Sequence, residues 1–581
     1  MATPAFPDLR AHAAGLFEAA LAAVAPAQSG VVVLIERPKQ AQHGDFACNV
    51  AMQLAKPLKR NPRDIATALI AALPVSPYVA KAEIAGAGFI NLFLNPAIKR
   101  AIVPHILARG TDYGRASVSR GAKIQVEFVS ANPTGPLHVG HGRGAAFGAS
   151  LANVLTAAGF DVEREYYVND AGRQMDILAL STWLRYLELV ATHIPFPANA
   201  YQGDYVIAMA QSLLARGGER YLRNAADVLA GASDASQDAE SHLDCLIANA
   251  KRLLAADYAD IHRHALNTQL ADCRDDLAEF GVNFECWYSE QSLYDSGKVE
   301  RAIARLAAAG HIYSNDGATW FRSTTFGDEK DRVVRRDNGQ FTYFASDIAY
   351  HLDKFERGFA RVIDVWGADH HGYIPRVKGA LAALGANPAQ LEIALVQFAV
   401  LYRGDKKVSM STRAGEFVTL RELRREVGND AARFFYVLRK SDQHLDFDLD
   451  LAKSQSNDNP VYYVQYAHAR VCSVLEQWGE NPAGLGAADP SPLTTEQESA
   501  LLSRLAEYPV VIDNTVRELS PHLVAFYLRE LAAEFHSYYN ATRLLAPEEP
   551  LKLARLALAV AVRHVLHNGL KLLGVSAPEK M

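Results

Sequence analysis

Between residues 123 and 168 the sequence predicts a strand, a sharp turn, a helix and a second strand, an order that leaves little choice of fold. Residues 123–129 alternate apolar and polar side chains, as a strand with one buried face requires. Ser130-Ala-Asn-Pro-Thr-Gly-Pro-Leu-His-Val-Gly-His141 then breaks the strand. A glycine- and alanine-rich helix runs to about Gly159, and residues 162–168 form the next strand. This β-α-β unit predicts parallel strands in one sheet.

The turn before the predicted helix is suited to binding a polyphosphate. The first N–H groups of a helix have no partner within it, and the positive end of the helix dipole lies there. His138 and His141 can donate hydrogen bonds to phosphate oxygens, and such bonds count most where charge grows in a transition state. Gly140 would let a flat base approach the backbone. A purely structural turn is the alternative.

Length and composition limit the class of protein. At 581 residues the chain is too long for one core, so three or four domains are expected. It has no apolar span long enough to cross a bilayer and no basic signal region at residues 1–8, so we expect a cytoplasmic protein without a membrane partner. Five cysteines without a C-x-x-C pair argue against disulfides and structural zinc. With a net charge of −6, any nucleic acid would have to bind local basic patches.

The turn resembles the His-Ile-Gly-His signature of class I aminoacyl-tRNA synthetases, with Val139 in place of isoleucine. A longer match is more specific. Residues 131–141, with Glu127 upstream and Tyr167-Val-Asn-Asp-Ala-Gly-Arg-Gln174 downstream, are similar to arginyl-tRNA synthetases, and the resemblance covers essentially the whole chain. It implies a ligase that uses ATP with Mg²⁺ to convert L-arginine to arginyl-adenylate and then transfers the arginyl group to the terminal ribose of tRNA(Arg). Such enzymes are usually monomers and generally activate arginine only with tRNA bound.

The resemblance also implies a multidomain α/β architecture. Residues 1–110 would be an N-terminal α/β addition that contacts tRNA, although the basic residues there are otherwise best explained as a solvated face. Residues 120–460 would be a Rossmann-like parallel-sheet catalytic domain, with a mainly helical insertion over about 175–335. Residues 461–581 would be an all-α anticodon-binding bundle, whose aromatic residues are either base-stacking surfaces or core.

The predicted ATP site combines the first signature with a second strand end. Residues 362–366 form an apolar strand closed by a polar turn, and in parallel sheets such turns meet at one edge. A plain surface turn is the alternative. The predicted ATP-binding residues are Ala131, Asn132, Pro133, Thr134, Gly135, Pro136, Leu137, His138, Val139, Gly140, His141, Asp369, His370 and Met410.

Residues 403–420 occupy the position of the second class I signature, Lys-Met-Ser-Lys-Ser, but lack its two lysines. Aligned on Met410 and Ser411, Ser409 and Thr412 replace them. Some relatives without these lysines carry one before the first signature's proline, where this chain has Gly135. Leaving pyrophosphate still needs positive charge. We expect Lys407 and Arg413 to supply it, with Lys406 within reach and Lys123 a weaker choice; an inactive, RNA-binding paralogue is the alternative. The predicted catalytic residues are His138, Gly140, His141, Lys407, Ser411 and Arg413.

Selecting arginine requires buried acceptors, because a guanidinium is always charged and offers five donors in a planar fork. By resemblance, Glu127, Tyr343 and Asp347 line this pocket, and Asn132 holds the α-amino or carboxylate group. Tyr343 and Asp347 would share a helix face. Glu127 lies among apolar residues, where an unpaired charge would be costly, so a cationic ligand is favoured. A related class I enzyme for another amino acid is the alternative.

Overall fold

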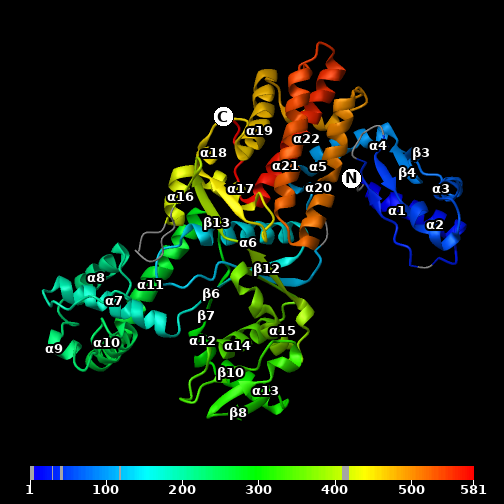
Figure 1. Ribbon diagram of the computed structural model, residues 1–581. Coiled ribbons are helices and arrows are strands. Elements are labelled where there is room, and N and C mark those ends of the chain that lie inside the picture. The colour runs from blue at the N-terminus through cyan, green and yellow to red at the C-terminus, as the bar shows by residue number, and fades with distance from the viewer. Residues whose placement is uncertain (1–5, 29, 39–42, 117–118, 409–417) are drawn as a thin grey trace.

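The computed structural model describes residues 6–28, 30–38, 43–116, 119–408 and 418–581. Figure 1 shows a central body with the N-terminal domain on one side and a helical arm on the other. A third lobe, which contains α12 to α15, extends below the body. The sequence-based expectation of several domains is met.

A five-stranded parallel sheet forms the centre of the region predicted to be the catalytic domain. Its order is β12-β11-β5-β6-β7 and every neighbouring pair is parallel. From β5 the chain adds β6 and β7 on one side, and it later adds β11 and β12 on the other side of β5. The boundary between β5 and β11 is therefore the topological switch point, the place where parallel sheets usually bind ligands. The strands are β5 (Lys123–Glu127), β6 (Asp161–Val168), β7 (Cys286–Ser289), β11 (Arg361–Gly367) and β12 (Leu391–Val396).

The predicted β-α-β unit is confirmed. Helix α6 (Val139–Ala157) joins β5 to β6, and β5 ends two residues before the predicted limit of the strand. Close packing explains the glycines: a Cβ added at Gly148 would lie 2.3 Å from the ring of Phe128. The small side chains of α6 therefore let the helix approach the sheet.

The helical insertion has its own core. Its helices are α7 (Arg173–Leu189), α8 (Asp204–Gly217), α9 (Ala225–Val228), α10 (Ala239–Leu254) and α11 (Ala256–Glu279). Chain after α11 returns to the main sheet as β7, and β8 (Ile312–Asn315), β9 (Ala318–Phe321) and β10 (Arg332–Arg335) form a small antiparallel sheet. The stretch to about residue 335 is mainly helical, as predicted, and it also contains these four short strands, which the sequence analysis did not predict.

The lower lobe and the region after the sheet complete the catalytic part of the chain. A further three-stranded sheet has the order β14-β13-β15. The elements are α12 (Gln291–Asp295), α13 (Lys298–Ala308), α14 (Tyr343–Glu356), α15 (Ile374–Ala383), β13 (Ala399–Arg403), β14 (Lys406–Lys407), α16 (Leu420–Val427), α17 (Asn429–Val437), β15 (Leu445–Asp448) and α18 (Leu449–Lys453).

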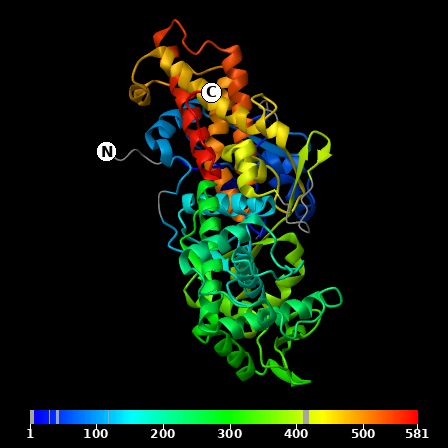
Figure 2. The ribbon, with the colours of Figure 1, turned by 90° about the vertical axis from the view of Figure 1, so that its left-hand side faces the viewer.

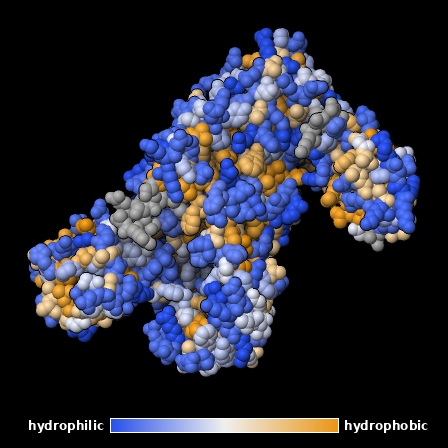
Figure 3. Space-filling model, viewed as in Figure 1, coloured by the Kyte–Doolittle hydropathy of each residue, from blue (hydrophilic) through white to orange (hydrophobic). Residues whose placement is uncertain are grey.

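The N-terminal domain is an antiparallel sheet, β1-β2-β4-β3, packed with helices around a separate core. Apolar surface gathers on this domain in Figure 3, and its exposed large apolar residues include Val32, Leu34 and Val75. The elements are α1 (Leu9–Val24), β1 (Ile35–Glu36), β2 (Phe46–Cys48), α2 (Val50–Leu58), α3 (Pro62–Ala71), β3 (Val79–Ala85) and β4 (Phe89–Leu94). Helix α4 (Pro96–Arg100) leads to α5 (Ile102–Arg109), whose buried residues belong to the main core.

A helical bundle closes the structure, consisting of α19 (Pro460–Trp478), α20 (Glu496–Glu518), α21 (His522–Ala541) and α22 (Glu549–Leu573). Helix α22 is long and apolar enough to cross a membrane by length and composition, contrary to our reading of the sequence, but 78% of its most apolar 18-residue stretch is buried. Figure 2 shows this helix, in red, running down toward α6. It is packed as a core helix.

Candidate active site

The two histidines of the first signature cap helix α6. His138 Nδ1 accepts the N–H of Gly140 at 3.1 Å, and His141 Nδ1 accepts the N–H of His138 at 3.3 Å. The rings are stacked with their centroids 3.7 Å apart. Since each Nδ1 accepts a backbone N–H, a neutral ring carries its proton on Nε2. Both histidines are therefore arranged as Nε2–H donors.

Burial keeps these histidines neutral. It lowers the pKa of His138, and burial together with His138 lowers the pKa of His141 to about 3. A Cβ added at Gly140 would lie 2.8 Å from the His138 ring, so glycine is needed to make room for that ring. Approach of a base to Gly140 stays a prediction. The pair can donate hydrogen bonds to phosphate oxygens without adding formal charge.

The segment between β5 and α6 is held by hydroxyls from three elements. Tyr166 on β6 donates to the carbonyl of Ala131 at 2.8 Å. Tyr205 on α8 donates to the carbonyl of Thr134, also at 2.8 Å. The Tyr436 hydroxyl on α17 donates to the carbonyl of Val139, the first residue of α6. At the start of the segment, residues 129 and 130 have positive φ angles of 68° and 41°. Non-glycine residues adopt such angles only where surrounding contacts fix them.

The second signature lies outside the described residues. Ser409, Met410, Ser411, Thr412 and Arg413 all fall within residues 409–417, so their predicted roles stay predictions.

The chain that follows residues 409–417 lies beside the first signature. The N–H of Val139 donates to the carbonyl of Val418 at 3.1 Å, and the N–H of Leu420 donates to Leu137 at 2.8 Å. Lys406 and Lys407, which precede residues 409–417, form the exposed strand β14 and pair with β13. Lys123, by contrast, begins β5 at the opposite edge of the sheet and pairs with Glu163 at 3.2 Å, which removes it from the candidates.

Glu127 is buried, but its charge is already paired within the protein. Lys354 Nζ donates to Glu127 Oε2 at 2.5 Å and to Asp364 Oδ1 at 2.7 Å, and Ser130 Oγ donates to Glu127 Oε1 at 2.8 Å. Lys354 is 0% exposed. The argument that an unpaired Glu127 favours a cationic ligand is therefore wrong, although contact between Glu127 and arginine stays a prediction.

Asp347 and Tyr343 lie one turn apart at the start of α14, as predicted. Asp347 is half-buried and accepts a hydrogen bond from the Tyr373 hydroxyl, whereas Tyr343 is 55% exposed. Tyr373 belongs to the short helix after β11 that also carries Asp369 and His370, both exposed at the carboxyl edge of the sheet. That edge is the one predicted for these two residues, and their contact with ATP stays a prediction.

The sequence analysis missed Glu290. This buried residue directly follows β7 at the same sheet edge, and Ser346 Oγ donates to it at 2.8 Å. Burial, with smaller contributions from Asp347 and Asp170, raises its pKa to about 7. Recognising residues 286–289 as a strand would have revealed it, because polar residues after such strands line ligand sites.

Three carboxylates raise the pKa of one phenol, that of Tyr167. Burial raises the pKa of Tyr167, and Glu290, Asp347 and Glu127 raise it further, in that order. The donors to these two carboxylates are neutral: the Tyr373 hydroxyl donates to Asp347, and the Ser346 hydroxyl and the Asn169 amide donate to Glu290, the amide at 2.7 Å. Among the described residues, neither carboxylate has a lysine or arginine at ion-pair distance. The pocket is therefore complementary to a cation. Asn132, at its rim, is exposed and donates to Gln174 Oε1 at 2.9 Å.

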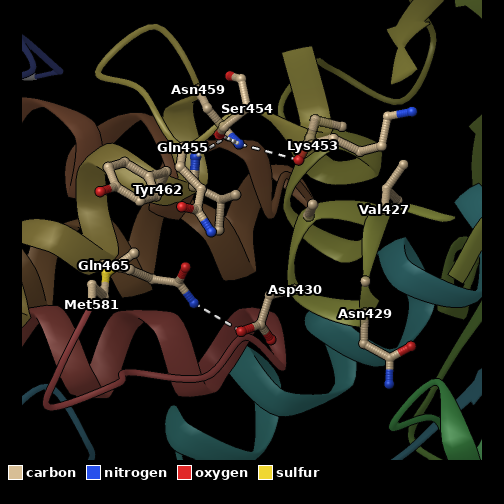
Figure 4. Close-up of a pocket in the computed structure, with 14 residues that line it drawn as sticks. Val427, Asn429, Asp430, Lys453, Ser454, Gln455, Asn459, Tyr462, Gln465 and Met581 are labelled. Atoms are coloured by element: carbon tan, nitrogen blue, oxygen red, sulfur yellow. Dashed lines mark hydrogen bonds between the residues drawn. The ribbon is translucent and has the colours of Figure 1, made fainter. Parts of the chain in front are cut away.

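At two other candidate sites, the charged side chains are paired with other residues of the protein. Glu163, Glu165 and Cys286 lie close enough together to hold a metal ion, but Arg357 donates to Glu165 at 2.5 and 2.9 Å. The hollow between α17, α18 and α19 (Figure 4) contains one cation among its described lining residues, Lys453, which pairs with Glu426 at 2.9 Å. Neither offers free cations for a polyphosphate.

Comparisons with known proteins cover nearly the whole chain. Residues 11–94 match the family model "Arginyl tRNA synthetase N terminal domain", residues 102–194 and 256–445 match "tRNA synthetases class I (R), catalytic domain", and residues 464–581 match "DALR anticodon binding domain". Arginine–tRNA ligase of Azoarcus sp. is 67% identical over 577 residues, which span 97% of this chain and 98% of that protein. The Nitrosospira multiformis ligase is 65% identical over 581 residues and all of both chains. The structure of Thermus thermophilus arginyl-tRNA synthetase has the same fold, with a TM-score of 0.75 at 24% identity over 99% of this chain and 100% of that one.

Proposed function

The chain belongs to the class I arginyl-tRNA synthetase family, whose members use ATP to join arginine to tRNA. On this basis we propose the following roles for its residues. Residues 131–141, with Asp369, His370 and Met410, bind ATP, which enters as its magnesium complex. His138 and His141 donate Nε2–H groups to phosphate oxygens and stabilise the charge that grows there. The capping geometry of these two histidines supports this role.

The acidic pocket binds the side chain of arginine. Asp347 and Glu290 accept from the guanidinium, and Glu127 and Tyr343 also line the pocket. Asn132 holds the α-amino or carboxylate group of the amino acid. The single observation that carries this proposal is that Ser346, the neighbour of Asp347, donates to Glu290, while neither carboxylate has a lysine or arginine at ion-pair distance among the described residues. So held, the arginine carboxylate is aligned for in-line attack on the α-phosphate, and no enzyme nucleophile is required.

The cations of the second signature act on the leaving group. Lys407 and Arg413 hold the β- and γ-phosphates as pyrophosphate departs, and Ser411 and the Gly140 backbone complete the site. The N-terminal domain (1–110) and the bundle (461–581) bind tRNA(Arg) on either side of the catalytic domain (120–460). We further propose a monomer that acts in the cytoplasm, away from membranes.

Arginine-dependent exchange of pyrophosphate into ATP tests this assignment, with each of the twenty amino acids and with or without bulk tRNA. Exchange should require arginine and tRNA. Asp347→Asn and Glu290→Gln should each raise KM for arginine roughly 10- to 150-fold, the value of one charge-assisted hydrogen bond. Glu356→Gln, on the exposed end of the same helix α14, is the control and should not change KM. Unchanged arginine saturation in both pocket variants would refute the pocket.

A further inference from the structure

A tyrosine of the helical insertion contacts the segment assigned to ATP. Tyr205 lies in the first turn of α8, and its hydroxyl donates to the Thr134 carbonyl at 2.8 Å. The phenol also lies against the next residue, since a Cβ added at Gly135 would be 3.1 Å from the Tyr205 hydroxyl oxygen. Residues 195–255, which include α8, fall outside the matched ranges of the catalytic family model. The contact therefore joins an added element to the first signature.

Local packing fixes the orientation of Tyr205. Its ring lies with Met175, Val206, Met209 and Ala265 in a small apolar cluster made by α7, α8 and α11. A Cβ added at Gly203 would lie 2.4 Å from the ring, so this glycine lets the side chain fold back toward residue 134. The aromatic body is anchored in the insertion while the hydroxyl reaches out of it.

A second contact ties the insertion to the same segment. Gln174, at the start of α7, accepts from Asn132 at 2.9 Å. The neighbouring Arg173 pairs with Glu240 at 2.6 Å and with Asp244 at 2.7 Å, both on α10. Asn132 and Thr134 are thus both held from the insertion side, whereas Ala131 is held by Tyr166 of the main sheet.

We propose that Tyr205 is a positioning residue for the activation step, which holds the backbone at Thr134 and Gly135 in the conformation that binds ATP. The proposal rests on the assignment of residues 131–141 to ATP. Through Tyr205 and Gln174, the position of the insertion affects the conformation of residues 131–141. Burial raises the pKa of the phenol, so Tyr205 acts as a neutral donor.

The test compares two tyrosine-to-phenylalanine variants of the full-length enzyme by pyrophosphate exchange at saturating arginine and tRNA. Tyr205→Phe keeps the ring and removes the hydroxyl. Tyr186→Phe is the matched control, because the Tyr186 hydroxyl also donates to a carbonyl, that of Gly218 at 2.6 Å, but within the insertion. Tyr205→Phe should raise KM for ATP roughly 2- to 12-fold, as expected for one neutral hydrogen bond, with kcat and melting temperature near those of the wild type.

The remaining outcomes separate the possible failures. A KM for ATP unchanged in Tyr205→Phe, or raised equally in Tyr186→Phe, would overturn the proposal, as would a lowered melting temperature with unchanged KM. Gly203→Ala, which displaces the ring, should raise KM for ATP at least as much, and a wild-type KM there would count against it. His141→Gln tests the ATP assignment itself: if neither its kcat nor its KM changes, that assignment fails whatever Tyr205→Phe does.

Discussion

Replacing Lys354 by methionine should destabilise the catalytic domain by about 3–5 kcal/mol, the usual cost of removing one partner of a buried ion pair. The side chain is 0% exposed, and its amine donates to Glu127 and Asp364 at 2.5 and 2.7 Å. Methionine fills nearly the same volume, so little of the loss comes from packing. What remains is two neighbouring carboxylates beneath the sheet edge without their cation.

The control is Lys298→Met, which removes a lysine that also contacts α14. Lys298 pairs with Asp353 at 2.7 Å, but its side chain is 29% exposed. Water screens such a pair, so we expect a loss of only about 0.2–1 kcal/mol. Urea unfolding followed by the fluorescence of the five tryptophans, which include Trp366 on β11, would measure both losses. Equal losses in the two variants would refute the reasoning that burial makes the difference.

The cost of Lys354→Met should also increase with pH. In the folded wild-type protein, Lys354 lowers the pKa of Asp364. Asp364 therefore stabilises the fold at pH values above its pKa in the unfolded chain, and this stabilisation is lost as pH falls through its pKa in the folded protein. Without the amine, burial and mutual repulsion raise the pKa of both carboxyls, and the variant loses stability as they ionise. Between about pH 5 and about pH 8 the difference from wild type should therefore widen; a constant or narrowing difference would contradict it.

Three further predictions concern the active site. Because the pKa of Glu290 is about 7 without arginine, KM for arginine should fall as pH rises from about 6 to about 8, and Glu290→Gln should abolish this dependence; a parallel fall in the variant would show that another group titrates. His141→Gln should lower kcat for exchange by a factor of about 10²–10³, the usual effect of removing one hydrogen-bond donor to a charge that develops in the transition state. Because the pKa of His141 is about 3, the wild-type rate should show no titration of this group near neutrality. Lys407→Met should lower kcat/KM for ATP roughly tenfold or more. Lys406→Met should leave kcat/KM unchanged, because successive residues of strand β14 face opposite sides. Equal effects of the two substitutions would contradict the role assigned to Lys407.

Local signals predicted the frame of the site well. Alternation in residues 123–129, the glycine-rich helix and the strand that follows all depend on neighbours in sequence, and the structure confirms each of them. The charges around the pocket depend instead on distant pairing. Lys354 meets Glu127 across 227 residues, and no local pattern marks it as a buried cation. Glu290 was missed because β7 is four residues long and follows five helices, so its position in the sheet is set by tertiary contacts.

Helix α22 has a consequence for the making of the protein. It is the last described helix to leave the ribosome, yet its apolar residues share one core with α5, α6 and the parallel sheet. A chain interrupted before residue 549 would leave apolar faces of α5 and α6 uncovered, surfaces of the kind that chaperones and proteases recognise. Completion of the core beneath helix α6 therefore requires the apolar residues of α22, which the ribosome adds late.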